Sequence, residues 1–117
     1  MASLEMKGPY VFNPARIDEV VTKRSAGNYA LGYTRDDGMF IVEYVGRSDA
    51  NVNQELKTRL SDGYQKFKYS YATSAKSAFE KECRNYHNFG ESAKLSNRYH
   101  PGRPEGTDWK CPVCKHF

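Results

Sequence analysis

The feature that most constrains the fold is a strand-turn-strand pattern over residues 28–46. Residues 35–38 read Arg-Asp-Asp-Gly and end in the Asp-Gly pair that favours tight hairpins, and the segments on both sides have strand composition. The motif Gly-Asn-Tyr at 27–29 opens the first strand, and Tyr-Val-Gly at 44–46 closes the second. The sequence therefore predicts a β-hairpin that places two phenols, Tyr29 and Tyr44, side by side on one sheet.

Periodicity and capping residues predict the other elements. A short helix begins at Pro14 behind an Asn13 cap, and a second helix has Val52, Leu56 and Leu60 on one face. Alternating polar and aromatic residues predict a strand, and a later helix starts after Thr73 or Ser74 and stops at Gly90. The expected ranges are 14–21, 28–46 for the hairpin, 51–60, 66–71 and 75–89.

This order of elements predicts an α+β fold with a small three-stranded antiparallel sheet flanked by helices, β-β-α-β-α in its core. At 117 residues the chain has room for one core and is expected to be a single domain. Residues 1–24 are expected to form a loosely ordered lead-in and the short helix, and residues 25–90 the core. Residues 91–117 are expected to form a loop-rich tail anchored by zinc.

Composition argues against a membrane-spanning, secreted or disulfide-stabilised protein. No stretch reaches the ~20 apolar residues of a membrane span, and the N-terminus lacks the apolar run of a signal peptide. Three cysteines make an odd number, which argues against a disulfide framework and favours the reducing cytoplasm. Residues 64–117 hold ten Lys/Arg against five Asp/Glu, as a phosphate-binding face requires, although a solvated lysine-rich surface has the same composition.

The tail contains the pattern of a structural zinc site. Cys111 and Cys114 form a CxxC knuckle, and Cys83 and His87 are four residues apart on one face of the predicted helix. The four side chains make a Cys₃His set for Zn²⁺, with His100 or His116 as rivals of His87 for the fourth position. Alternatively, Cys83 is a small buried hydrophobe and the CxxC is a free dithiol or redox pair.

Taken in order, these motifs resemble the GIY-YIG nuclease domain, over roughly residues 9 to 114. The resemblance identifies Tyr29 and Tyr44 as the motif tyrosines, and Arg59, in its Arg-Leu context, as the helix arginine. It identifies Glu82 as the glutamate that binds a catalytic Mg²⁺ or Mn²⁺ ion, and Asn97 as the asparagine that follows the last helix. The Cys/His tail is similar to that of small members of the family.

Two choices of residue stay open within this resemblance. Arg47, directly after the glycine of the second motif, is a rival or partner of Arg59 for binding phosphate. Glu80 competes with Glu82, but the two lie roughly 200° apart around a helix, so only one of them can face the tyrosines. The first motif also departs from the family pattern, because its middle residue is Asn28 rather than an apolar residue.

The resemblance implies a metal-dependent endonuclease that hydrolyses phosphodiester bonds of nucleic acid, with DNA as the expected substrate. Tyr29 would deprotonate or orient the attacking water, and a base role requires nearby cations to lower its pKa. The alternative is a catalytically silent module that binds nucleic acid or protein. A redox role for Cys111 and Cys114 is a third reading, and a protein partner or a homodimer is open.

Overall fold

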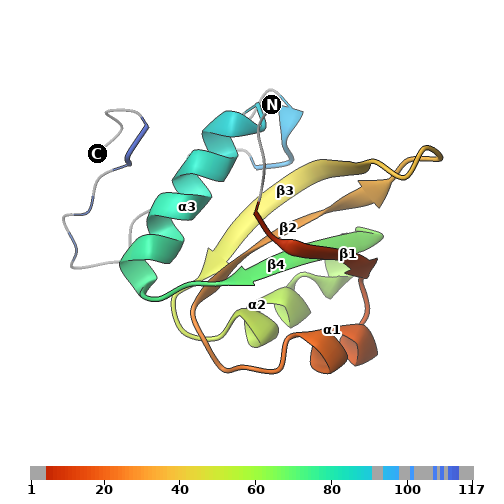
Figure 1. Ribbon diagram of the computed structural model, residues 1–117, viewed down its shortest axis with the longest axis horizontal. Coiled ribbons are helices and arrows are strands. Elements are labelled where there is room, and N and C mark those ends of the chain that lie inside the picture. Colours follow the sequence, from red (N-terminus) through yellow and green to blue (C-terminus); the bar gives the residue numbers. More distant parts are fainter. Residues whose placement is uncertain are drawn as a thin grey trace.

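Four strands form one antiparallel sheet in the computed structural model, which describes residues 5–90, 94–97, 101, 107, 109 and 111–113 (Figure 1). The strands lie in the order β1-β4-β2-β3, so β2 and β4 are central and β1 and β3 are the edges. The strands are β1 (Lys7–Val11), β2 (Gly27–Thr34), β3 (Phe40–Ser48) and β4 (Lys66–Tyr71). The helices are α1 (Pro14–Val20), α2 (Val52–Thr58), a short 3₁₀ helix (Leu60–Asp62) and α3 (Ala75–Asn88).

The prediction of three strands was wrong, because the expected lead-in contains β1. This strand pairs antiparallel with β4 through Lys7 and Tyr69, Tyr10 and Phe67, and Val11 and Lys66. It is largely exposed and contains Gly8-Pro9, a pair that is tolerated at a sheet edge and gives no strand signal in the sequence. At Gly8, where φ is 120°, an added Cβ would lie 2.9 Å from the carbonyl oxygen of Phe67, so glycine permits this close pairing.

The predicted hairpin is confirmed as β2 and β3. The Asp37 carboxylate accepts a hydrogen bond from the backbone N–H of Met39, and Gly38 has φ of 87°, as the tight turn requires. Tyr29 pairs with Gly46, and a register shift after Leu31 leaves an extra residue on β3. The pairing extends the hairpin to Gly27 and Ser48 at its open end.

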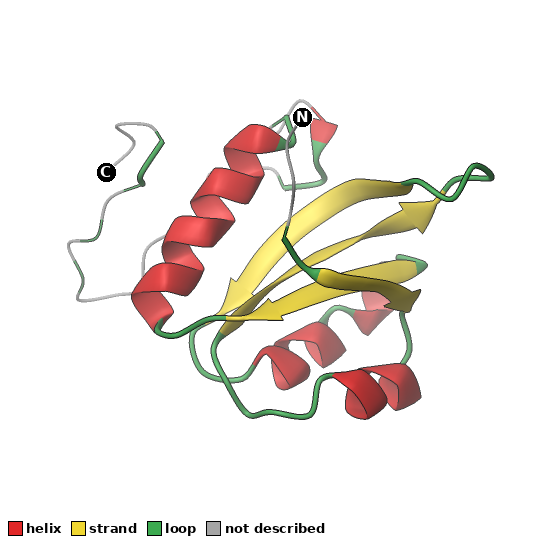
Figure 2. Ribbon diagram, viewed as in Figure 1, coloured by secondary structure: helices red, strands yellow, loops and turns green. Residues whose placement is uncertain are grey.

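The helices cover the two faces of the sheet, as Figure 2 shows. On one face, α1 and α2 contribute to a core built largely from alternate residues of β2 and β4. On the other face, α3 lies across β2 and β3. The core under α1 and α2 is the larger one, and its fully buried members include Ile17, Leu31, Val52, Leu56 and Phe67.

The predicted helix starts and stops are confirmed where capping residues are present. Asn13 caps α1, with Pro14 as its first residue, and the Ser74 side chain caps α3 within a capping box. Gly90 follows α3 with φ of 105°. Helix α2 is shorter than expected, because its N-cap is Asn51 and the 3₁₀ helix follows it directly.

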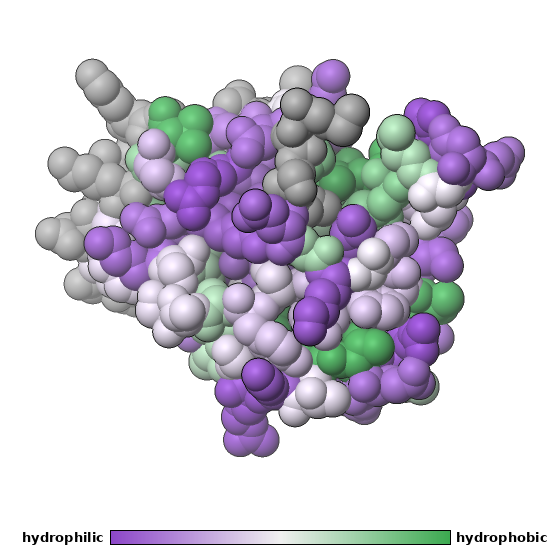
Figure 3. Space-filling view, viewed as in Figure 1, coloured by the Kyte–Doolittle hydropathy of each residue, from purple (hydrophilic) through white to green (hydrophobic). Residues whose placement is uncertain are grey.

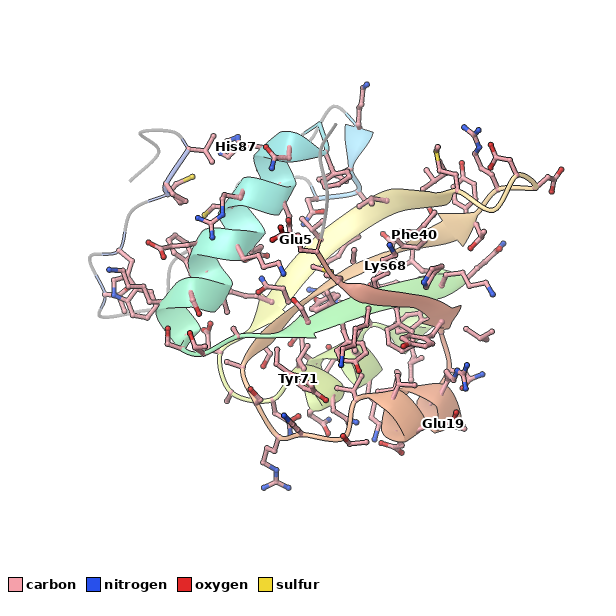
Figure 4. The ribbon with its side chains drawn as sticks, in the orientation of Figure 1. Glu5, Glu19, Phe40, Lys68, Tyr71 and His87 are labelled. Carbon is pink, nitrogen blue, oxygen red and sulfur yellow. The ribbon has the colours of Figure 1, made fainter. Side chains whose placement is uncertain are left out.

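A tyrosine at the end of β4 fixes the connection that leads into β2. The Tyr71 hydroxyl accepts hydrogen bonds from the backbone N–H groups of Thr22 and Lys23, at 3.0 and 3.2 Å, and Figure 4 shows Tyr71 on the side of α1 and α2. This connection delivers the chain to Gly27, where β2 and the first tyrosine motif begin.

The molecular face that carries α3 is predominantly polar, with isolated apolar areas (Figure 3). One such area lies beside β3, where the ammonium group of Lys68 is 5.4 Å from the centre of the Phe40 ring (Figure 4). Within the described part of the chain, no helix combines the length and apolar character needed to cross a bilayer.

Candidate active site

A cavity of about 230 Å³ lies where the open end of the hairpin meets α2 and α3. It collects residues from β2, β3, α2 and α3 and from the loop that follows β3. Five of the six catalytic candidates from the sequence line it, and Asn97 does not. The lining residues are Tyr29, Tyr44, Gly46, Arg47, Ser48, Asp49, Glu55, Arg59 and Glu82.

The two motif tyrosines form the wall of the cavity on the hairpin. Their rings stack with centroids 6.2 Å apart and planes inclined by 22°, so the prediction that they lie side by side is confirmed. The Tyr29 ring lies against the backbone of Gly46, where an added Cβ would approach its Cζ and hydroxyl oxygen to 2.4 Å. The glycine of the second motif is therefore required by the position of the first tyrosine.

The Tyr29 phenol is buried and bonded to a carboxylate that the sequence did not single out. Tyr29 is 1% exposed, and its hydroxyl donates a hydrogen bond to Oε2 of Glu55 at 2.9 Å. Burial, followed by the negative charge of Glu55, raises the pKa of Tyr29 above its ordinary value of 10. The condition for a base role, that nearby cations lower this pKa, is not met, because loss of hydration outweighs the effect of Arg59.

An ion pair joins β3 to α3 across the cavity. Nη1 of Arg47 lies 2.6 Å from Oε1 of Glu82, and the two side chains are 12% and 11% exposed. Nε of Arg47 also lies 2.9 Å from Oδ1 of Asp49. Of the two candidate glutamates, Glu82 lines the cavity and Glu80 does not.

Burial dominates the ionisation of Glu82. Burial, with a smaller contribution from the charges of Asp49 and Glu55 and against the attraction of Arg47, raises the pKa of this carboxyl to about 7. Glu82 is therefore an oxygen donor held in a site already rich in negative charge. The guanidinium groups of Arg47 and Arg59 line the same cavity and offset part of this negative charge.

Arg59 approaches the cavity from the end of α2. It is the C-cap residue rather than part of the helix, and its guanidinium carbon lies 4.9 Å from the centre of the Tyr44 ring. Its Nε is 3.7 Å from Oε2 of Glu55, and its Nη1 is 3.6 Å from Oδ2 of Asp62. Arg59 and Arg47 thus both line the cavity, so the structure brings the rival arginines together.

Asn97 binds the backbone of β3 through both atoms of its side-chain amide. Its amide oxygen accepts a hydrogen bond from the backbone N–H of Val45 at 3.0 Å, and its amide nitrogen donates one to the Val45 carbonyl at 2.8 Å. Because β3 is an edge strand, this side chain supplies the pairing that a further strand would give at Val45. Asn97 does not line the cavity, and a catalytic role for it stays a prediction.

Asn28, the polar residue in the first motif, faces α3. It is fully buried, and its amide nitrogen donates a hydrogen bond to the carbonyl of Ala78 at 2.8 Å. Its Oδ1 has no hydrogen-bond partner among the described residues. The departure from an apolar residue therefore has a structural reason, since Asn28 links β2 to the first turn of α3.

Three lining residues were missed by sequence reasoning: Ser48, Asp49 and Glu55. Glu55 carried one usable signal, because it precedes Arg59 by four residues and so shares its side of the helix. Asp49 lies two residues after Arg47, close enough to pair with it at the end of the strand. Ser48 carried no comparable signal, and its hydroxyl accepts the backbone N–H of Asn51 as the chain turns into α2.

Two of the predicted zinc ligands meet behind Glu82. Cys83 and Cys111 are both buried and lie within hydrogen-bonding reach of each other, in a cluster with Phe79 and Trp109. Burial, and then the contact with Cys111, raise the pKa of the Cys83 thiol. The Phe79 ring connects this cluster to the cavity, because it lies 6.3 Å from Trp109 and 5.2 Å from the Arg47 guanidinium carbon.

Of the other predicted zinc ligands, His87 alone belongs to the described residues. His87 lies toward the end of α3, with its ring 5.4 Å from that of Tyr86 (Figure 4). Cys114, His100 and His116 lie outside the described residues. Among the residues that are described, no three His, Cys, Asp or Glu side chains form a group able to hold a metal ion.

A functional assignment depends on the cavity itself, since no family model, curated protein or solved structure matches the chain.

Proposed function

We propose that this protein is a metal-dependent endonuclease of the GIY-YIG type that hydrolyses phosphodiester bonds in DNA. One observation carries the proposal: two stacked phenols, two guanidinium groups and one buried carboxylate line a single cavity. Phosphodiester hydrolysis needs an oriented water, cations for the phosphoryl oxygens and a ligand for a divalent metal. The cavity offers a candidate for each need.

The two arginines are suited to bind the phosphate. Each presents a planar, permanently charged fork that can donate two hydrogen bonds to phosphoryl oxygens. Arg59 packs on the Tyr44 ring, which restricts its motion, and Arg47 is restrained by Glu82 and Asp49. Binding a phosphate would give Arg47 a new anionic partner in place of Glu82.

Glu82 is the residue that fits the catalytic Mg²⁺ or Mn²⁺ ion. Its carboxylate supplies the hard oxygen ligands that these ions prefer, and Asp49 and Glu55 add negative charge around it. When bound there, the ion would neutralise charge on the phosphoryl and leaving oxygens. Release of Arg47 from Glu82 would free one carboxylate oxygen for this role.

The tyrosines are suited to orient the attacking water. The Tyr29 hydroxyl lies on the cavity wall, and its ring is fixed between Tyr44 and Gly46. Tyr29 stays protonated at neutral pH because burial raises its pKa, so it acts as a hydrogen-bonding group for water rather than as a phenolate. Tyr44 limits the space in which that water can move.

The test is a cleavage assay on plasmid, single-stranded and branched DNA in Mg²⁺ and in Mn²⁺. Wild-type protein should nick at least one of these substrates, and EDTA should abolish the nicking. Glu82→Gln should reduce the rate by at least a hundredfold, whereas Glu80→Gln, on the same helix but outside the cavity, should match wild type. Equal rates for the two variants would rule out Glu82 as the metal ligand.

A zinc site in the tail is the second part of the proposal. Two buried thiols in contact, Cys83 and Cys111, are the soft ligands that Zn²⁺ prefers, and the CxxC motif places Cys114 next in the chain. Metal analysis of protein purified without chelator should find about one zinc per chain, lost in Cys111→Ser. Zinc content of His87→Ala compared with that of His100→Ala identifies the fourth ligand. Absence of zinc from wild-type protein would contradict the proposed zinc site.

A catalytically silent binding module is the competing function. It is favoured by the Arg47–Glu82 pair, which already satisfies the charges of both side chains. Binding to DNA that weakens with salt, without cleavage in either metal, would support it. Within either proposal we place the protein in the cytoplasm, because an odd number of cysteines argues against a disulfide framework. A protein partner or a homodimer stays a prediction.

A further inference from the structure

The hydrogen bond between Tyr29 and Glu55 sets the direction in which a proton can move. A phenol has one proton, and Tyr29 donates it to Oε2 of Glu55 at 2.9 Å. The Arg59 guanidinium also lies within hydrogen-bonding reach of the phenol oxygen. The remaining lone pair of that oxygen is the part of the hydroxyl left to interact with a molecule in the cavity. Tyr29 in this arrangement accepts a hydrogen bond from water and does not donate one to it.

The structure holds Glu55 in place for this contact. Val52 and Leu56 of α2 are fully buried in the core, which fixes the rotation of the helix about its axis. Nε of Arg59 lies 3.7 Å from Oε2 of Glu55, the same oxygen that accepts the hydrogen bond from the Tyr29 hydroxyl. Glu55 therefore contacts both a buried phenol and an arginine on the wall of one cavity, which distinguishes it from a glutamate that contacts only solvent.

We infer that Glu55 is the final acceptor of the proton from the attacking water, with the Tyr29 hydroxyl as the relay between them. The inference rests on the proposed nuclease activity and adds a residue to it. Glu55 acts through Tyr29 and does not touch the substrate, so it is a positioning residue in the terms of the reaction. Tyr29 is the group that meets the water.

The proposed step is the attack of water on the phosphorus of the phosphodiester. The water oxygen forms a bond to phosphorus while one water proton passes to the Tyr29 oxygen and the Tyr29 proton passes to Oε2 of Glu55. The bond from phosphorus to the leaving oxygen breaks with its electron pair, and that oxygen takes a proton from solvent water. Glu55 ends the step as a neutral carboxylic acid and returns its proton to solvent.

This route avoids a free phenolate. Burial raises the pKa of Tyr29 above 10, so a phenolate at this position is rare at neutral pH. In the relay the phenol oxygen gains one proton as it loses another and carries no full charge. Positioned acid-base groups of this kind contribute about 10² to 10⁴ in rate.

The experiment compares Glu55→Gln, Glu55→Ala and Tyr29→Phe under conditions in which the wild type cleaves DNA. Glu55→Gln keeps an oxygen that can accept the Tyr29 hydroxyl but takes up no proton, so kcat should fall at least a hundredfold while KM stays within threefold. The double variant of Glu55→Gln with Tyr29→Phe should be no slower than the slower single variant, because the two residues act as one unit. Asp62→Asn, which removes the other carboxylate near Arg59, is the matched control and should cleave at the wild-type rate.

Formate separates a proton acceptor from a purely structural residue. In Glu55→Ala, added formate occupies the vacated space and should restore at least tenfold of the lost rate, whereas it should not rescue Tyr29→Phe. An unchanged kcat in Glu55→Gln, a loss confined to KM, or a loss that formate does not reverse would overturn the relay. Absence of cleavage by the wild type would instead overturn the nuclease proposal, and the relay with it.

Discussion

Replacing Glu82 by glutamine should stabilise the metal-free protein at alkaline pH, although it removes one member of an ion pair. Burial raises the pKa of Glu82 from 4.5 to about 7, which means that the fold favours the neutral acid over the carboxylate. Below pH 4.5 the group is protonated in both folded and unfolded chains and has no effect on their difference. As pH rises from 4.5 to 7 the folded state holds the proton more strongly, so stability falls.

The size of the effect follows from the same two values. Each pH unit in this interval lowers the free energy of unfolding by about 1.4 kcal/mol, so the ionised group costs about 3 kcal/mol above pH 7. Glutamine carries no charge at any pH and avoids this cost. The Tm of Glu82→Gln should therefore exceed that of wild type by roughly 10 °C at pH 8 and match it at pH 4.

Urea unfolding at pH 4 and pH 8, in EDTA, measures the difference directly. Glu80→Gln is the matched control, because it removes the same charge from the same helix away from the cavity, and should stay within about 0.5 kcal/mol of wild type at both pH values. A lower free energy of unfolding for Glu82→Gln at pH 8 would refute the reasoning. That result would mean that attraction to Arg47 outweighs the loss of hydration.

Three further predictions test other parts of the site. Gly46→Ala should destabilise the fold by about 1–3 kcal/mol in chemical denaturation and abolish cleavage, because its Cβ would lie 2.4 Å from the Tyr29 hydroxyl oxygen; normal activity would show that this tyrosine is free to move. Asn97→Ala should cost about 2 kcal/mol in the same assay, through the unpaired backbone groups of Val45, yet leave the cleavage rate per folded molecule unchanged; a specific loss of rate would support a catalytic role. Calorimetric affinity for Mn²⁺ should rise with pH up to about 7, as Glu82 ionises, and a flat profile would place the metal elsewhere.

Local signals predicted the parts of the fold that depend on neighbouring residues. The sequence predicted the Asp-Gly turn, the Asn13 and Ser74 caps and the end of α3 at Gly90, because each depends on side chains within a few positions along the chain. The sequence did not predict strand β1, because an exposed edge strand needs no alternation of apolar residues and the Gly-Pro pair in β1 suggests a turn.

Some residues of the candidate site could likewise be predicted from the sequence, and others could not. Tyr29, Tyr44 and Glu82 were found because an ordered motif names them. Glu55 looked like a solvated helix residue, and only the folded structure places it against a buried phenol. The contact of Asn97 with Val45 could not be predicted, because it depends on which strand lies at the edge of the sheet. The pKa of Tyr29 depends on burial that no local pattern reports.

The central claim is that one cavity binds both a divalent metal and the scissile phosphate. A crystal structure of the protein with Mn²⁺ and a DNA oligonucleotide, using anomalous diffraction to locate the metal, tests it most directly. The account predicts a manganese peak at the Glu82 carboxylate and a phosphate group between Arg47 and Arg59, with the Tyr29 hydroxyl facing it. Manganese or DNA bound elsewhere, with Arg47 still paired to Glu82, would contradict it.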